Sequence, residues 1–281
     1  MNKEVLLLLH LFPREIDDFD NLANQLKVAA KYIQELKVDA NIILNLNPEL
    51  IDWEGSLISQ DFIISKFEHI ITKFNWCRNL LVEVSSGTKY WGYLEQRVQA
   101  PKVHSDYDGY LLLDPDLILD DYVFYGLENT LNTIQDSEFI ISAQMYKFWD
   151  SSWDIISYDK RQYSFDVDEF DPYTVKTLPK EQINILSNKQ IKFAGGWFNY
   201  ISAPLYKTVE FPEGVKGYGP EDTFIALQAT KRGATQYIME GIVVQENRKY
   251  LNNKIYAEHI QYKTDKLKEI NIQTKALFNL F

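Results

Sequence analysis

Apolar and polar residues form alternating blocks along the first half of the chain, and these blocks have the lengths of strands and helices. Continuous apolar runs predict buried strands. They occur at residues 4–12, 40–47, 79–85, 109–114 and 138–144. Apolar residues at helical spacing fill residues 19–37 and 57–74. Strands that alternate with helices in this way predict an α/β fold, in which a mostly parallel sheet carries helices on both faces.

Two segments do not follow this rhythm. The segment before the fourth apolar run, which contains Trp91 and Arg97, has a mixed pattern. Residues 146–190 combine tryptophans, tyrosines and acidic residues without a helical or strand period. That composition suits a sugar-stacking surface or a lid, and it equally suits a solvated insertion anchored by a few aromatic residues.

Length and charge narrow the classes of function. A chain of 281 residues with 46% hydrophobic residues can bury a large core, so one large α/β domain fits. The net charge of -11 disfavours a surface that holds phosphate backbones, although a local basic groove is compatible with it. We therefore do not expect nucleic acid as a partner.

The cysteine count and the first apolar run indicate the compartment. The single cysteine, Cys77, excludes an intramolecular disulfide and suits a reducing cytosol. Residues 4–12 are too short to span a membrane, and no small-residue cleavage site follows them. We expect a cytoplasmic protein without a transmembrane segment.

Two candidate functional residues follow the end of the fourth apolar run. Asp114 and Asp116 follow that run directly, and Pro115 fixes the backbone between them. The Asp-x-Asp pattern also occurs at positions 18/20, 106/108 and 166/168, but only the pair at 114 and 116 ends a continuous apolar run. In doubly wound sheets, ligands bind outside the carboxyl ends of the strands. The pair therefore lies where a ligand site is expected.

Two carboxylates so close together suit a metal ion. No basic residue adjoins Asp114 or Asp116 in the sequence, so we expect them to repel each other until a cation binds. Hard oxygen ligands favour Mg²⁺ or Mn²⁺, which also take phosphate oxygens from a substrate. The alternative is a turn in which both acids face water.

Two glycine-containing segments follow later in the chain. Residues 193–202 read FAGGWFNYIS, and residues 217–233 read GYGPEDTFIALQATKRG. Gly195 and Gly196 allow a strained turn or a close approach of the backbone to a ligand.

The second of these segments predicts a helix. Pro220 opens it, Glu221 and Asp222 stand in its first turn, and Gly233 ends it. Acidic residues at a helix start match the helix dipole, so by themselves they indicate structure as readily as function.

An acidic strand end, a Gly-Gly-aromatic segment and a Gly-x-Gly-Pro-Glu-Asp segment, in that order, resemble the GT-A glycosyltransferases, which use nucleotide sugars. The resemblance is to galactosyltransferase and N-acetylgalactosaminyltransferase families with a GGxFxxIS…GWGxED block. Here the block reads AGGWFNYISAPLYKTVEFPEGVKGYGPEDTFI, residues 194–225. The resemblance implies one GT-A-like, Rossmann-related domain over residues 1–281. Its nucleotide-sugar-binding half would be residues 1–145, and its acceptor and catalytic half residues 146–281.

The resemblance also implies roles for single residues. Asp114 and Asp116 would bind the Mn²⁺ or Mg²⁺ that holds the diphosphate of a donor such as a UDP-sugar. Glu221 and Asp222 would contact sugar hydroxyls, with Asp222 as the catalytic base if the reaction inverts. The implied substrate-binding residues are Arg14, Arg97, Gly195, Gly196, Trp197 and Asn199.

The third metal ligand departs from the family pattern. Related enzymes often carry a histidine downstream of the Glu-Asp pair, where this chain reads VVQENR at residues 243–248. Glu246 and the later His259 are the candidates to replace it, unless the two aspartates suffice. His10, in the first apolar run, is expected to be a packed strand residue and not a ligand.

These residues predict a metal-dependent hexosyltransferase. Its donor would be a nucleotide sugar, and its acceptor would be a hydroxyl of a carbohydrate or another molecule. A cation would stabilise the departing diphosphate, and a positioned carboxylate would take the proton of the acceptor hydroxyl. The Glu-Asp block favours inversion of configuration, while the donor sugar and the acceptor stay open.

Other classes of protein could carry similar carboxylate motifs on a related fold. A DNA-modifying glycosyltransferase of the phage type would share the donor site. A nucleotidyltransferase would normally carry a glycine- and lysine-rich loop after the first strand, whereas the first glycine here is Gly55. A glycoside hydrolase needs two carboxylates across the scissile bond, which would leave Asp116 without a role. A non-catalytic protein of this fold would have no need of the carboxylates.

Overall fold

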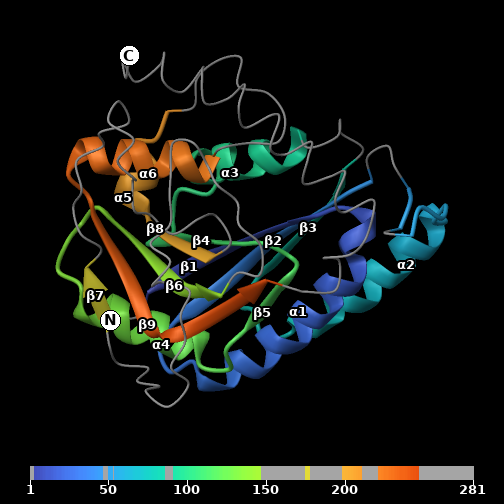
Figure 1. The fold of residues 1–281 in the computed structure, drawn as a ribbon, viewed down its shortest axis with the longest axis horizontal. Helices are drawn as coiled ribbons and strands as arrows, with labels where there is room; N and C mark the ends of the chain where they lie inside the picture. The colour runs from blue at the N-terminus through green and yellow to red at the C-terminus, as the bar shows by residue number, and fades with distance from the viewer. Residues whose placement is uncertain are drawn as a thin grey trace.

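One mixed sheet forms the centre of the molecule (Figure 1). The computed structural model describes residues 3–46, 50–52, 54–85, 91–146, 175–177, 198–210 and 221–246. Within them the sheet has nine strands, in the order β3-β2-β1-β4-β8-β6-β9-β5, and β7 pairs with β9 beside this path. The strands are β1 (Glu4–Leu11), β2 (Lys37–Asn45), β3 (Leu80–Ser85), β4 (Gly109–Leu113), β5 (Leu117–Leu119), β6 (Phe139–Tyr146), β7 (Val175–Thr177), β8 (Phe198–Ser202) and β9 (Thr235–Glu246).

Most strands of the sheet run in one direction. β3, β2, β1 and β4 pair in parallel, and so do β6 and β9. β8 is inserted between β4 and β6 and is antiparallel to both, so β6 runs in the same direction as β4. β5 and β7 are antiparallel to β9. The predicted α/β fold with a mostly parallel sheet is therefore confirmed.

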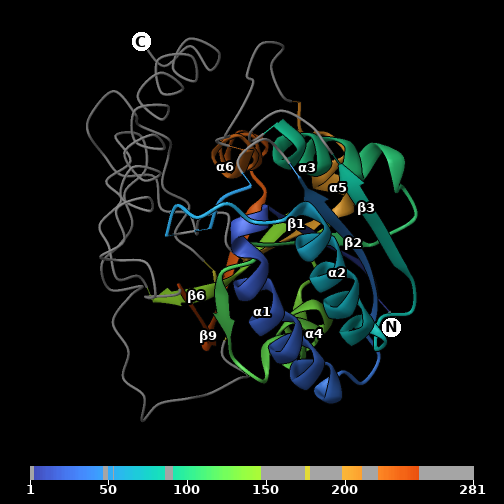
Figure 2. The ribbon, with the colours of Figure 1, turned by 90° about the vertical axis from the view of Figure 1, so that its right-hand side faces the viewer.

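Helices cover both faces of the sheet, as the two side views show (Figures 1 and 2). Apolar side chains of α1, α2 and α4 pack on one face, and those of α3, α5 and α6 pack on the other. The helices are α1 (Ile16–Ala29), α2 (Gln60–Ile71), α3 (Trp91–Val103), α4 (Val123–Thr133), α5 (Ala203–Tyr206) and α6 (Glu221–Arg232). Short 3₁₀ turns add η1 (Pro13–Glu15), η2 (Ala30–Tyr32) and η3 (Thr72–Phe74). No helix in the described ranges is long and apolar enough to cross a bilayer.

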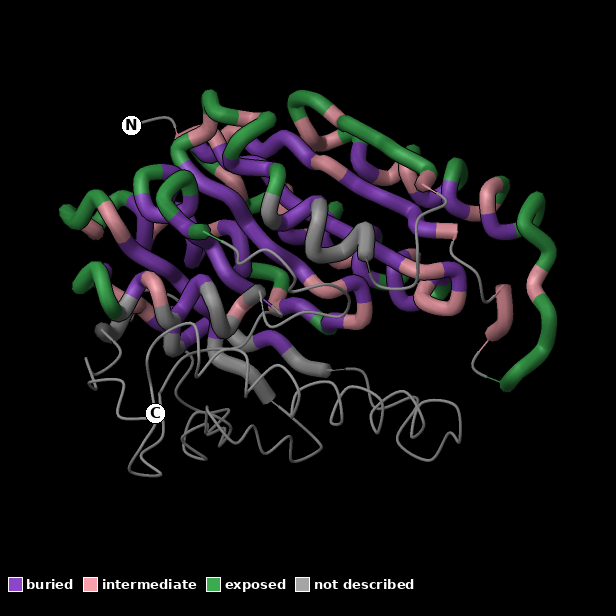
Figure 3. The backbone as a smooth tube through the Cα atoms, turned by 90° about the horizontal axis from the view of Figure 1, so that it is seen from above, coloured by how far each residue is buried: buried purple, intermediate pink, exposed green. Residues whose placement is uncertain are grey.

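Buried residues fill the centre of the molecule (Figure 3), and β1 is buried from Val5 to Leu11. It is paired on both edges and covered on both faces, so its side chains alternate between the two packed layers. Leu7 and Leu9 belong to the layer of α1, α2 and α4, while Leu6 and Leu8 belong to the layer of α3, α5 and α6. This double burial explains why the strand reads as a continuous apolar run.

Helix α3 was not predicted, and polar groups are prominent among its described buried side chains. Ala100 is its member of the apolar core, and Pro101 lies inside the helix. Gln96 is buried and donates its side-chain amide to the Leu9 carbonyl at 3.2 Å and to the Asn41 Oδ1 at 2.8 Å. A helix held in this way lacks the apolar stripe by which helices are found in a sequence.

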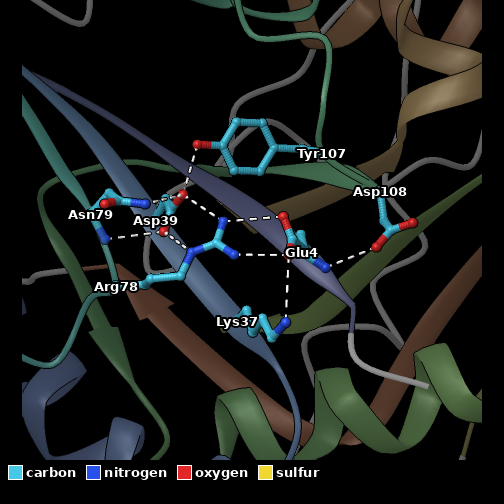
Figure 4. Close-up of polar contacts among 7 residues, drawn as sticks. All are labelled: Glu4, Lys37, Asp39, Arg78, Asn79, Tyr107 and Asp108. Atoms are coloured by element: carbon cyan, nitrogen blue, oxygen red, sulfur yellow. Dashed lines mark hydrogen bonds and ion pairs between the residues drawn. The ribbon is translucent and has the colours of Figure 1, made fainter.

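A charged cluster closes the amino-terminal edge of the sheet (Figure 4). Asp39 of β2 is 1% exposed and accepts hydrogen bonds from the Arg78 Nη2 at 2.8 Å, the Asn79 backbone N–H at 3.0 Å and the Tyr107 hydroxyl at 2.8 Å. Arg78 also donates to Glu4, at the start of β1, at 2.8 Å. Burial alone would raise the pKa of Asp39, but the bonds from Arg78, Asn79 and Tyr107 outweigh it and lower the pKa to about 2. The cluster joins the first residues of neighbouring strands.

We expect Asp39→Asn to lower the free energy of unfolding by about 2 kcal/mol at neutral pH, since it removes the ionised acceptor. Because the folded-state pKa lies below the usual value of 3.8, this stabilisation is complete above about pH 4 and is lost as the pH falls towards 2. Urea denaturation at several pH values measures the difference between parent and variant.

Asp17→Asn is the matched control, because Asp17 is exposed and pairs with Lys66 at the surface. It should cost no more than about 0.5 kcal/mol. An Asp39→Asn variant as stable as this control, or equally destabilised at pH 2.5 and pH 7, would contradict the assignment.

Candidate active site

The predicted aspartates lie at the carboxyl edge of the parallel strands. β4 ends at Leu113, which pairs with Leu9 of β1, and Asp114 follows at once. Asp114 and Asp116 are both half-buried, while Pro115 between them is buried. The polypeptide therefore presents two partly accessible carboxylates at the end of a buried strand.

A buried arginine contacts the first of these carboxylates. Arg97 of α3 donates from Nη2 to the Asp114 Oδ1 at 2.8 Å. Our expectation that the two aspartates have no basic neighbour is therefore wrong. The arginine precedes Asp114 by 17 residues, and only the packing of α3 on the sheet brings it there. A metal ion at this site would therefore bind to a pair of carboxylates whose negative charge is already partly neutralised by Arg97.

His10 follows Leu6 and Leu8 at alternate positions along β1, which places it on the face of the sheet that α3 covers. It is 1% exposed in β1, which agrees with the expected packed strand residue. Burial lowers its pKa to about 3, and the positive charge of Arg97 adds to that effect. His10 is therefore neutral at physiological pH.

The strand register brings the end of β9 to the acidic pair. Glu246 is the last residue of β9, and it is the pairing partner of Leu117, which directly follows Asp116. Paired residues of antiparallel strands have Cα atoms about 4.5–5.5 Å apart. The backbone of the tentative ligand Glu246 therefore lies beside the predicted metal site.

Helix α6 directs its first turn to the same edge. At its other end, the Arg232 Nε donates to Glu138 at 2.9 Å, and Glu138 precedes the first residue of β6. α6 has 12 residues and is therefore about 18 Å long, so its first residue lies about that far from the Arg232 end, in the direction of the carboxyl edge. Glu221 and Asp222 thus start the helix towards the carboxyl edge, and Asp222 is half-buried. The Gly233 end was predicted correctly, and Gly233 has a φ of 76°; Pro220, the predicted start, lies outside the described residues.

The remaining predicted residues have different surroundings. Arg14 is half-buried in η1, which follows β1 at the carboxyl edge. Asn199 is buried in β8, where its Oδ1 accepts a hydrogen bond from the Ser142 hydroxyl. Phe198, the first residue of β8, pairs with Leu113, next to Asp114.

Several predictions fall outside the described part of the chain. Outside the described residues lie Gly195, Gly196, Trp197, His259 and the side chains of Glu221 and Glu246. Of the irregular segment at residues 146–190, residues 147–174 and 178–190 also lie outside them, while Val175–Thr177 form the strand β7, which was not predicted. Among the described residues, no three His, Cys, Asp or Glu side chains are grouped as a metal site requires. In the part of the chain that the structure describes, Asp114 and Asp116 are therefore the two candidates to bind a metal ion.

Comparison with known proteins identifies the fold. No protein-family model and no curated protein matches this chain significantly. The structure of this chain is similar to the crystal structure of residues 1–349 of S. aureus TarS, with a TM-score of 0.52 and 13% sequence identity. The match covers 87% of this chain and 60% of the TarS fragment. The same fragment in complex with UDP-GlcNAc matches with a TM-score of 0.51 and 12% identity, over 87% of this chain and 59% of that one. The fold is accordingly α/β and GT-A-like, and the chain spans about 60% of the length of the TarS fragment.

Proposed function

We propose that this chain is a glycosyltransferase that moves a hexose or N-acetylhexosamine from a nucleotide sugar to an acceptor hydroxyl. The main support is that Asp114 and Asp116 end β4 of a GT-A-like sheet, at the edge where β1 also ends and towards which α6 starts. TarS, which has this fold, was crystallised with UDP-GlcNAc. A UDP-sugar is therefore the first donor to test.

The donor half of the site would hold a divalent cation. Asp114 and Asp116 supply hard carboxylate oxygens that are half-exposed, which fits Mn²⁺ or Mg²⁺. Glu246 or His259 would complete the ligand set. When bound, the ion would act as a Lewis acid on the departing diphosphate. Arg14, after β1, is the candidate to contact the donor directly.

The acceptor half would supply the base. We propose that Asp222 accepts the proton of the acceptor hydroxyl while that oxygen bonds to the anomeric carbon of the sugar. The sugar–phosphate bond breaks on the opposite side, and its electron pair leaves with the nucleoside diphosphate, so the configuration inverts. Glu221, Gly195, Gly196 and Trp197 would line the sugar and acceptor pocket. The positive helix end favours the ionised form of a carboxylate in the first turn of α6.

The two halves of the chain would divide these tasks. Residues 1–145 contain β1 to β4, which end at the donor side, and residues 146–281 contain the start of α6. The single Cys77 supports a reducing, cytoplasmic location.

A ligand panel tests the proposed function. The protein is incubated with UDP-, GDP-, ADP- and CDP-sugars, with Mn²⁺ or with EDTA, and its melting temperature and donor hydrolysis are recorded. We expect at least one nucleotide sugar to stabilise the protein and to be hydrolysed slowly with Mn²⁺ alone. If nucleoside triphosphates bind and no nucleotide sugar does, a nucleotidyltransferase is the better assignment. Glucosylation of duplex DNA would instead identify a DNA-modifying transferase.

Asp116→Ala should abolish Mn²⁺-dependent donor binding while the protein stays folded, because a hard ligand is lost. Isothermal titration calorimetry with donor and Mn²⁺ measures this. Asp106→Ala is the control, since Asp106 stands in an exposed Asp-x-Asp pair on the amino-terminal side of β4. Equal donor and metal affinity in the Asp116→Ala and parent proteins would disprove the metal assignment.

Asp222→Asn should retain donor affinity and lose transfer by about a hundredfold or more, because the amide keeps the shape but cannot accept the proton. Product formation in single-turnover assays measures the transfer step. Asp61→Asn, in the first turn of α2, controls for the loss of a helix-start charge. Near-parent transfer by the Asp222→Asn variant, with an inverted product, would exclude Asp222 as the base.

A further inference from the structure

Arg97 has an unusual environment for a charged side chain. It is 1% exposed and is among the largest fully buried side chains of the described residues, whereas the side chain of its partner Asp114 is 31% exposed. A buried guanidinium is costly unless it is paired and hydrogen-bonded. The pair therefore extends from the interior to the candidate site, with the arginine on the inner side.

The backbone that carries Arg97 is fixed from two directions. On the sheet side, the neighbouring Gln96 bonds to the Leu9 carbonyl of β1 and to the Asn41 side chain of β2. On the other side, the Tyr206 hydroxyl of α5 donates to the Arg97 carbonyl. The guanidinium thus starts from a backbone that three elements of the fold hold in place.

The sequence had suggested that Arg97 binds the substrate itself. A side chain that is 2% exposed offers almost no surface to a ligand, whereas Asp114 at its tip is accessible. Outer partners of metal ligands commonly act in this way: they orient the ligand without touching the metal or the substrate.

We propose that Arg97 is a positioning residue, which holds the Asp114 carboxylate at the end of β4 ready for the donor's cation and acts on the donor only through Asp114. This inference rests on the proposed function. Arginine suits the task because its planar fork fixes the orientation of a carboxylate, which the single ammonium of lysine does not.

Removal of the guanidinium should weaken Mn²⁺-dependent nucleotide binding. Calorimetric titration with UDP and Mn²⁺ should show a 10- to 100-fold weaker affinity for Arg97→Met, the usual effect of losing an outer partner of a metal ligand. Arg97→Lys should lie between parent and Arg97→Met, since it keeps the charge and loses the fork. Circular dichroism and melting temperature confirm that each variant is folded, and Arg97→Lys serves alone if Arg97→Met does not fold.

A double-mutant cycle separates positioning from direct contact. In the Asp114→Asn protein, Arg97→Met should weaken UDP–Mn²⁺ binding by less than threefold, because the carboxylate through which Arg97 acts on the donor is already absent. If Asp114→Asn binds too weakly to titrate, the same cycle in the free energy of unfolding without ligand should show that the two substitutions are not additive.

Three results would overturn the inference. Arg97→Met that binds within threefold of the parent would overturn it and leave the proposed function intact. If Arg97→Met weakens UDP–Mn²⁺ binding equally in the parent and in the Asp114→Asn protein, or if the effects of the two substitutions on the free energy of unfolding are additive, Arg97 acts independently of Asp114. A parent protein that binds neither Mn²⁺ nor any nucleotide would overturn the proposed function and this inference with it.

Discussion

The parallel pairing of β1 with its two neighbours is the constraint on which the rest of the structure depends. Buried on both faces, β1 pairs with β2 on one edge and with β4 on the other, and Leu9 pairs with Leu113. This register fixes the level at which β4 ends, and thus where Asp114 leaves the core. A slip by one residue would bring Asp108 or Asp114, which flank β4, into a buried position of the sheet.

The two ends of these strands have different chemistry. At the amino-terminal edge, Asp39 is almost fully enclosed and receives hydrogen bonds from arginine, asparagine and tyrosine, so its charge serves to join strands. At the carboxyl edge, Asp114 is paired on its inner side and remains partly accessible. The first arrangement stabilises the fold. The second fits a site that accepts a ligand, as open α/β sheets provide at this edge.

Much of the fold was predictable because burial leaves a direct trace in the sequence. The strands β1, β2, β4 and β6 coincide with continuous apolar runs and are buried over most of their described residues, and α6 was found from Pro220 and Gly233. β3 also coincides with an apolar run, but the prediction that it is buried is wrong, because it is an edge strand in which Leu81, Val82 and Val84 are exposed. α3 was missed because its sequence has no regular apolar stripe, and a buried amide and a buried guanidinium are among the groups that attach it. The Arg97–Asp114 contact depends on that packing, which no local spacing shows. Glu246 was named only as an alternative ligand, and it takes the pairing of β9 with β5 to place its backbone near Asp116.

The central claim is that the carboxyl edge around Asp114 and Asp116 holds a metal-bound nucleotide. A crystal structure of the protein grown with UDP and Mn²⁺, in which anomalous scattering locates the manganese, tests this claim most directly. We expect manganese within about 2.0–2.3 Å of a carboxylate oxygen of Asp116 or Asp114, the range of ordinary metal–oxygen bonds, with the diphosphate on its outer side. Manganese bound elsewhere, such as at the Asp39 cluster, or UDP bound away from this edge would contradict it.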